Sequence, residues 1–128
     1  MVSTQPVIAV VDDESSVRTM LGRVLRVADY QVAPFSSGED FLASLATSLP
    51  ACVILDIHMP GMSGLEVQAC LREAKVRIPV VFITASDDPT LDEAVRWPDT
   101  TRLLRKPFPV DELLAAISVA LAPPADGA

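Results

Sequence analysis

At 128 residues the chain is long enough for one domain with a single hydrophobic core, and too short for a second domain of ordinary size. Seventeen acidic against ten basic residues give a formal net charge of −7, which argues against binding nucleic acid through the chain's own phosphate contacts. The N-terminus carries no basic signal segment, and no apolar run approaches the ~18 residues of a membrane span, so we expect a cytoplasmic protein.

The first half of the chain alternates between apolar runs and helical patterns. Residues 7–11 are continuously apolar, as in a central strand covered by helices on both faces. A helix is predicted from Ser15, because the following apolar residues fall on one face: Val17, Met20, Leu21, Val24, Leu25 and Ala28. Residues 30–34 then read as a short, half-polar strand, in which Pro34 indicates a sheet edge.

Two further helices are predicted from capping signals. The spacing of Ser36 and Glu39 is that of a capping box, and the buried stripe of its helix is Phe41, Leu42 and Leu45. Residues 52–55 are an apolar strand that runs into Asp56. The box repeats at Ser63 and Glu66, where the helical stripe is Val67, Cys70, Leu71 and Ala74.

The last third continues the alternation. Residues 80–83 are a fully apolar strand ending in Thr84, and a short helix follows with Asp88 as N-cap and Pro89 at its first position. Its inward residues are expected to be Leu91, Ala94 and Val95. Residues 101–105 form a more polar strand, after which the last helix is striped by Val110, Leu113, Leu114, Ile117 and Leu121.

Five strand-helix units indicate a parallel sheet with right-handed crossovers. The first, third and fourth strands are apolar throughout and should be central, whereas the second and fifth carry polar residues and should be edges. We therefore expect a doubly wound (βα)5, flavodoxin-like α/β fold with a five-stranded sheet in the order 2-1-3-4-5. The domain covers residues 1–121, and residues 122–128 are expected to be a disordered tail or the start of a linker.

Polar residues follow four of the predicted strands. They are Asp12 and Asp13 after the first, Asp56 after the third, Thr84 after the fourth and Lys106 after the fifth. Because parallel strands align their carboxyl ends, these side chains are expected to meet in one cleft. Taken singly each has a plainer explanation, such as a helix cap, a turn residue or a solvated lysine, but their joint placement favours a shared site.

The three carboxylates of this cleft would repel one another. A pair ~4 Å apart at an effective dielectric of ~20 costs ~4 kcal/mol, enough to shift a pKa or recruit a cation, and oxygen ligands suit Mg²⁺, with Mn²⁺ able to substitute. With the charge offset, Asp56 is a candidate nucleophile toward a phosphoryl donor. Lys106 and Thr84 would then stabilise the phosphoryl oxygens.

The chain resembles the response-regulator receiver domains of two-component signalling over residues 7 to about 121. The motifs that carry the resemblance are Val11-Asp12-Asp13, the Leu55 to Gly64 run LDIHMPGMSG, Thr84-Ala85 and Lys106-Pro107-Phe108. The resemblance implies that Asp56 is the phosphoacceptor and that Thr84 and Lys106 are switch residues. It also implies that Asp13 binds the metal directly, Asp12 through water, and His58 through its backbone carbonyl.

The resemblance further implies a sensor histidine kinase as phosphodonor and a domain that catalyses only its own phosphorylation and dephosphorylation. The overall appearance is closest to receivers of helix-turn-helix transcription regulators, which suggests an output domain, no direct nucleic-acid contact in this segment, and homodimerisation through the face of the fourth helix, fifth strand and fifth helix. The Lys106-Pro107 peptide is expected to be cis. Leu103 replaces the family's usual aromatic residue, and Pro98-Asp99-Thr100 replaces its usual Gly-Ala, so the fourth helix should be short or displaced.

Three alternatives remain open from the residues. A phosphatase of the haloacid-dehalogenase kind typically has a second aspartate two positions after its nucleophile, where this chain has His58. A flavodoxin-like cofactor binder would need N–H donors where Asp12 and Asp13 stand. A receiver-like module that binds partners without phosphorylation fits the Leu103 departure but not the full acidic, Thr and Lys set. The two cysteines, Cys52 and Cys70, lack metal-type spacing and are expected to be reduced thiols.

Overall fold

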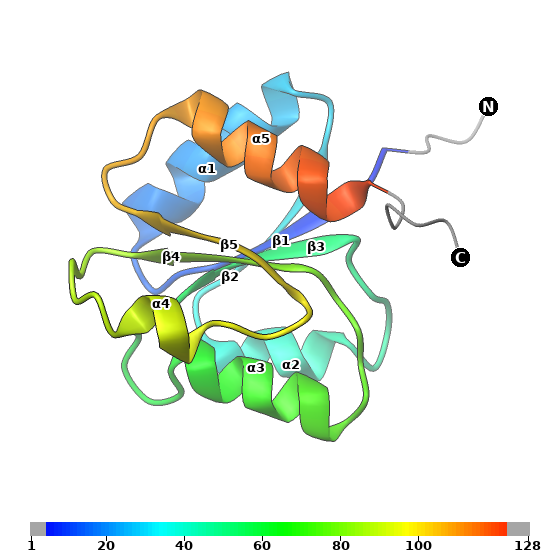
Figure 1. The fold of residues 1–128 in the computed structure, drawn as a ribbon. Helices are drawn as coiled ribbons and strands as arrows, with labels where there is room; N and C mark the ends of the chain where they lie inside the picture. Colours follow the sequence, from blue (N-terminus) through cyan, green and yellow to red (C-terminus); the bar gives the residue numbers. More distant parts are fainter. Residues whose placement is uncertain (1–4, 123–128) are drawn as a thin grey trace.

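Five parallel strands form one sheet in the order β2-β1-β3-β4-β5, the order predicted from strand hydropathy. A computed structural model describes residues 5–122 (Figure 1). The strands are β1 Val7–Val11, β2 Gln31–Phe35, β3 Cys52–Asp56, β4 Val80–Thr84 and β5 Thr100–Arg105. Every residue of β3 and β4 is buried, whereas β2 and β5 are partly exposed edges, so the expected fold class is confirmed.

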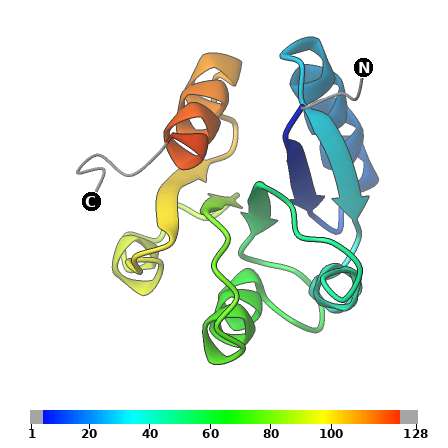
Figure 2. The same ribbon diagram turned by 90° about the vertical axis from the view of Figure 1, so that its right-hand side faces the viewer.

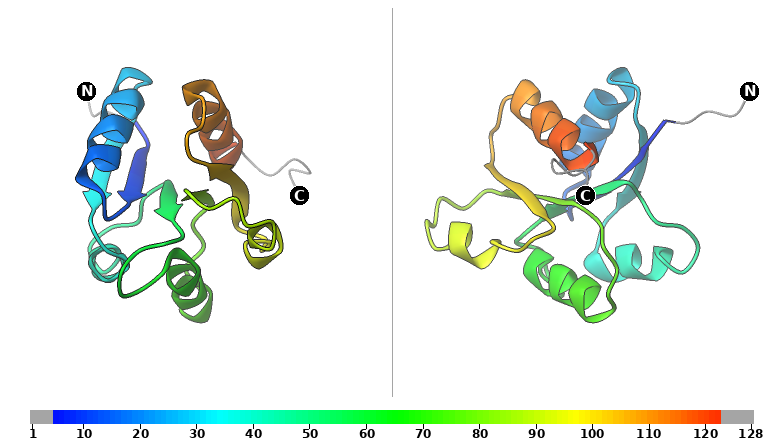
Figure 3. Two further views of the ribbon diagram at one scale, coloured as in Figure 1. Left: turned by 90° about the vertical axis from the view of Figure 1, so that its left-hand side faces the viewer. Right: turned by 45° about the vertical axis from the view of Figure 1, so that its right-hand side comes forward.

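Helices cover both faces of the sheet (Figures 1 and 2). They are α1 Ser15–Val27, α2 Gly38–Ser44, α3 Gly64–Glu73, α4 Leu91–Ala94 and α5 Val110–Leu121. The helices α1 and α5 lie on one face, and α2, α3 and α4 on the other (Figure 3). Each face has its own core: Leu21, Leu25 and Ile117 pack against one side of the sheet, while Phe41 and Val67 pack against the other.

Several predicted boundaries were wrong by one or two residues. The cap of α2 is Ser37, whose hydroxyl accepts the backbone N–H of Asp40, so the predicted Ser36 capping box does not form. The capping box of α3 from Ser63 to Glu66 is confirmed. At α4, Thr90 is the cap residue and Asp88 lies before the helix, where its carboxylate accepts the backbone N–H and hydroxyl of Thr90.

Some residues predicted to face inward are exposed. Ala94 is exposed in α4, which spans only one turn, and Met20 and Val110 are 43% and 46% exposed. The helical spacing of apolar residues identifies the face that points inward, but it does not show where that face meets solvent. These three side chains lie at that boundary. The fourth helix is short, as expected from the sequence.

The start of β5 is tied to α3 by polar and aromatic contacts. The buried Gln68 side chain donates to the hydroxyl of Thr100 at 2.8 Å. Next to this contact the register between β4 and β5 shifts, because Val80 pairs with Thr100 and Val81 with Arg102. The guanidinium of Arg72 stacks 3.5 Å from the ring centre of Trp97, so the segment before β5 also contacts the last turn of α3.

Two expectations concern the ends of the chain and the membrane. The last helix ends at Leu121, with Ala122 as its C-cap. The rest of the predicted tail, residues 123–128, lies outside the described residues. Among residues 5–122, no helix combines the length and hydrophobicity of a membrane span. Both cysteines are free, with Cys52 buried in β3.

Candidate functional site

Three carboxylates meet at the carboxyl edge of the sheet, where sequence reasoning placed the cleft. The strands β1 and β3 are neighbours, with Val11 opposite Leu55, so the acids that follow or end them lie side by side. One oxygen each from Asp12, Asp13 and Asp56 lie within 4.8 Å of one another. Asp12 and Asp56 are buried and Asp13 is exposed, so the cluster opens to solvent on one side.

Lys106 supplies the positive charge of this cleft. Its Nζ lies 2.9 Å from Asp12 Oδ2 and 3.8 Å from both Asp56 Oδ2 and Glu14 Oε1. Partial burial of the ammonium opposes its charge, but the hydrogen bond to Asp12 and the charges of the three acids outweigh burial and raise the pKa of Lys106. The peptide bond between Lys106 and Pro107 is cis, as expected.

The position of Asp56 in the cleft raises the pKa of its carboxyl group. Its pKa is raised from 3.8 to about 6, mainly by burial and then by the nearby charge of Asp12, with a smaller contribution from Asp13. Lys106 and the backbone N–H of His58 act in the opposite direction. The His58 N–H donates to Asp56 Oδ1 at 3.3 Å. A carboxylate destabilised in this way is poised to take on a cation or a covalent partner.

Thr84 ends β4 at the same edge, and its side chain is fully buried. Ile83 pairs with Asp56 in the sheet, which places Thr84 beside the first residues after β3. Its hydroxyl accepts the backbone N–H of Ser86 at 3.0 Å and lies 3.2 Å from His58 Nδ1. The structure therefore brings Thr84 to the cleft, and the side chain of His58 contacts this hydroxyl.

Two residues that sequence analysis did not assign also shape the cleft. Arg18 of α1 donates to the backbone carbonyl of Asp12 at 2.7 Å, and the backbone N–H of Glu14 donates to Asp12 Oδ1 at 2.9 Å. These bonds fix the first carboxylate of the cluster. Glu14 directly follows the two aspartates, so its place was readable from the sequence, whereas the reach of Arg18 back along α1 was not.

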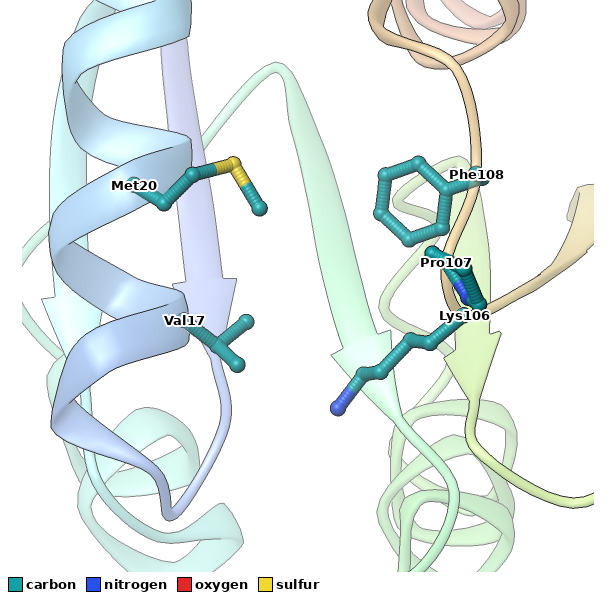
Figure 4. A pocket seen from close by; sticks show the side chains of 5 residues that line it. All are labelled: Val17, Met20, Lys106, Pro107 and Phe108. Atoms are coloured by element: carbon teal, nitrogen blue, oxygen red, sulfur yellow. The ribbon is translucent and has the colours of Figure 1, made fainter.

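An apolar pocket of about 340 Å³ adjoins the cleft. Figure 4 shows Val17 and Met20 of α1 facing Pro107 and Phe108, with the Lys106 side chain extending from the end of β5. Lys106 lines this pocket and also contacts Asp12 and Asp56, so the same side chain borders the pocket and the acidic cleft.

The donor set fits a hard divalent cation. The three clustered groups offer carboxylate oxygens, which Mg²⁺ and Mn²⁺ prefer, and no sulfur or imidazole nitrogen belongs to the cluster. The exposed Asp13 leaves room for the waters that Mg²⁺ usually retains. Whether the His58 backbone carbonyl joins this set, as the resemblance implies, stays a prediction.

The fold and this cleft define a CheY-like signalling domain, in which a doubly wound sheet carries an acidic cluster and a lysine at its carboxyl edge. The chain belongs to the response regulator receiver domain family, whose model matches residues 8–118. The family match favours the receiver interpretation over the flavin-binding and phosphatase alternatives left open by the sequence.

Two curated relatives and one solved structure illustrate the match. The chain is 33% identical over 118 residues to nodulation protein W of Bradyrhizobium diazoefficiens, covering 92% of this chain and 52% of that protein. It is 39% identical over 116 residues to the response regulator TodT of Pseudomonas putida, covering 90% and 51%. The response regulator TrrA of Thermotoga maritima, in complex with Mg²⁺-BeF, superposes with a TM-score of 0.82 at 32% identity, covering 91% of this chain and all of that one.

The family fixes the general role of the chain. Receiver domains are signalling modules of two-component systems and do not turn over an external substrate. The family implies a histidine kinase as phosphodonor, joins receivers to output domains in related proteins, and typically binds Mg²⁺ at an acidic pocket. This chain spans about half the length of nodulation protein W and TodT.

Proposed function

We propose that this receiver accepts one phosphoryl group from a sensor histidine kinase on Asp56 and thereby switches a partner or an output domain. The observation that carries the proposal is the position of the Asp56 carboxylate, buried among two further acids and 3.8 Å from the Lys106 ammonium. An oxygen of Asp56 forms the new O–P bond as the N–P bond of the donor's phosphohistidine breaks. Neutralising its negative charge is the main requirement for this attack.

Each residue of the cleft has a part in this proposal. Lys106 stabilises the phosphoryl oxygens, and the buried hydroxyl of Thr84 donates to one of them once the group is in place. Asp13 and Asp56 would hold a divalent cation directly and Asp12 through water, and the His58 backbone carbonyl would be a further ligand. When bound, Mg²⁺ supplies charge neutralisation between the carboxylates and the transferred group. The Mg²⁺-BeF complex of the related TrrA supports this assignment.

The wider context of the switch is also proposed. The relatives TodT and NtrC are a response regulator and a DNA-binding transcriptional regulator, which supports a role for this chain as a cytoplasmic receiver that controls transcription through an output domain. Residues 1–121 form the receiver, and residues 122–128 lead toward that output domain. Phosphorylation would strengthen homodimerisation through the α4-β5-α5 face.

The direct test is phosphorylation by a small-molecule donor. Incubation with acetyl phosphate and Mg²⁺ is expected to add the mass of one phosphoryl group, stable in acid and labile in base, as an acyl phosphate should be. Intact-mass spectrometry measures the addition, and peptide mapping places it at Asp56.

The matched control is Asp56→Asn, which keeps the shape of the side chain and removes its nucleophilic oxygen. We expect this variant to acquire no label. Equal labelling of Asp56→Asn and the parent chain would contradict the assignment of the phosphoacceptor. A parent chain that never labels would instead favour a phosphorylation-independent interaction module.

Mg²⁺ binding should depend on pH because the same carboxylates bind protons. Asp56 has a pKa of about 6, so below that value protons compete with the cation and the affinity for Mg²⁺ should fall. Thermal denaturation with and without Mg²⁺ is expected to show a rise in Tm above pH 6 that shrinks as the pH falls. Asp13→Asn should reduce the rise, and Glu73→Gln, an exposed change at the end of α3, should not. A Tm rise in Asp13→Asn equal to that of the parent would argue against Asp13 as a ligand.

A further inference from the structure

The hydroxyl of Thr84 is already engaged before any phosphoryl group arrives. It accepts the backbone N–H of Ser86 at 3.0 Å, and His58 Nδ1 lies 3.2 Å away. A hydroxyl has one proton and two lone pairs to share. Ser86 occupies one lone pair, and with the imidazole proton on Nε2 the unprotonated His58 Nδ1 accepts the hydroxyl proton of Thr84.

His58 also contacts the phosphoacceptor, because its backbone N–H donates to Asp56 Oδ1 at 3.3 Å. One residue therefore connects the carboxylate at the end of β3 with the hydroxyl at the end of β4. Thr84 is fully buried, whereas His58 is exposed, so the imidazole can leave the hydroxyl without opening the core.

We propose that His58 is a positioning residue whose Nε2-protonated tautomer accepts the Thr84 hydroxyl proton in the unphosphorylated chain and must release it before Thr84 can donate to a phosphoryl oxygen on Asp56. This inference rests on the proposed function of Asp56. The contact stabilises the unphosphorylated state relative to the phosphorylated one, since it exists only in the former. Its removal therefore shifts the equilibrium toward the phosphorylated arrangement by the contribution of one hydrogen bond.

The test compares His58→Ala, which removes the contact, with His58→Asn, which keeps a polar atom at the corresponding position. Beryllofluoride with Mg²⁺ is the probe, because it mimics a phosphoryl group on the carboxylate without covalent chemistry, and calorimetry measures its affinity. His58→Ala should bind beryllofluoride about three- to tenfold more tightly than the parent, and His58→Asn should return toward the parent value. Equal or weaker binding by His58→Ala overturns the proposal.

A double-mutant cycle separates positioning from a general effect of the substitution. In a Thr84→Val background the hydroxyl is absent, so His58→Ala should leave the beryllofluoride affinity unchanged. An equal gain in both backgrounds would show that His58 acts by another route and would overturn the proposal.

A measurement without a phosphoryl mimic keeps this proposal distinct from the proposed function. Three-bond couplings to the Thr84 methyl group report its χ1 rotamer by NMR. The parent should populate one rotamer, and His58→Ala should average over more than one. An unchanged rotamer in His58→Ala overturns the positioning role even if Asp56 is phosphorylated. Absence of beryllofluoride binding and of labelling in the parent chain would instead contradict the proposed function of Asp56.

Discussion

Asp56→Asn is expected to stabilise the metal-free fold while it removes phosphorylation. Burial and two acidic neighbours raise the pKa of Asp56 to about 6, so its ionised form is disfavoured in the folded chain. A shift of this size corresponds to at most about 3 kcal/mol, and screening through the solvent side of the cleft reduces our expectation to about 1–2 kcal/mol. The ammonium of Lys106 keeps its partner in the variant, because it is bonded to Asp12 at 2.9 Å.

The gain should depend on pH in a definite direction. In the unfolded chain Asp56 has a pKa near 3.8, below its folded value of about 6. Below pH 3.8 the group is protonated in both states and contributes no penalty. As the pH rises to about 6 the folded state binds more protons than the unfolded state, so the stability of the parent falls relative to the variant. The full advantage of Asp56→Asn is therefore expected above pH 6.

Urea denaturation of both proteins in a chelator measures this difference across the pH range. Glu73→Gln, which removes an exposed charge far from the cleft, should change the free energy of unfolding by no more than about 0.5 kcal/mol. A destabilised Asp56→Asn at neutral pH would mean that the charge of Asp56 is stabilised in the fold, contrary to its raised pKa. Saturating Mg²⁺ should reduce the stability advantage of Asp56→Asn over the parent. The parent binds the cation more tightly, because it offers one more charged carboxylate.

The sequence was sufficient to predict the sheet and the gathering of the cleft. Continuous apolar runs mark β1, β3 and β4 as central, and parallel topology then forces Asp12, Asp56 and Thr84 to one edge. Both predictions depend only on the hydrophobic pattern and on the order of the strands along the chain, and the sequence contains both.

The contacts within the cleft could not be predicted in the same way. Neither the bond of Lys106 to Asp12 nor the contact of His58 with Thr84 follows from spacing, because both depend on side-chain rotamers across different loops. The cap of α2 was misplaced from Ser37 to Ser36 because adjacent serines offer equivalent signals, and only the backbone path distinguishes them.

Gly64→Ala is expected to destabilise the protein by about 3 kcal/mol, because the first turn of α3 packs directly against the backbone of Asp56, the proposed phosphoacceptor. A Cβ at Gly64 would overlap the carbonyl oxygen of Asp56 and lie 3.0 Å from both the Asp56 carbonyl carbon and Ile57 Cα. The backbone N–H of Gly64 donates to the carbonyl of Ile57 at 2.9 Å, and the Ser63–Glu66 capping box fixes the start of the helix. The helix therefore cannot retreat without losing these bonds.

Gly64→Ala should slow the phosphorylation of Asp56 as well as destabilise the fold. Moving the Asp56 backbone by about 1 Å misplaces its carboxylate against Lys106, so labelling by acetyl phosphate should slow by about 10²-fold even where the variant remains folded. The control is Gly22→Ala in the middle of α1, where a Cβ would lie 3.1 Å from the terminal nitrogen of the exposed Arg26. That side chain can move aside, and alanine favours the helix by about 0.5–1 kcal/mol, so urea denaturation should find this variant as stable as the parent or more so. Equal stability and labelling of Gly64→Ala and the parent would contradict the inference that close packing of α3 positions Asp56.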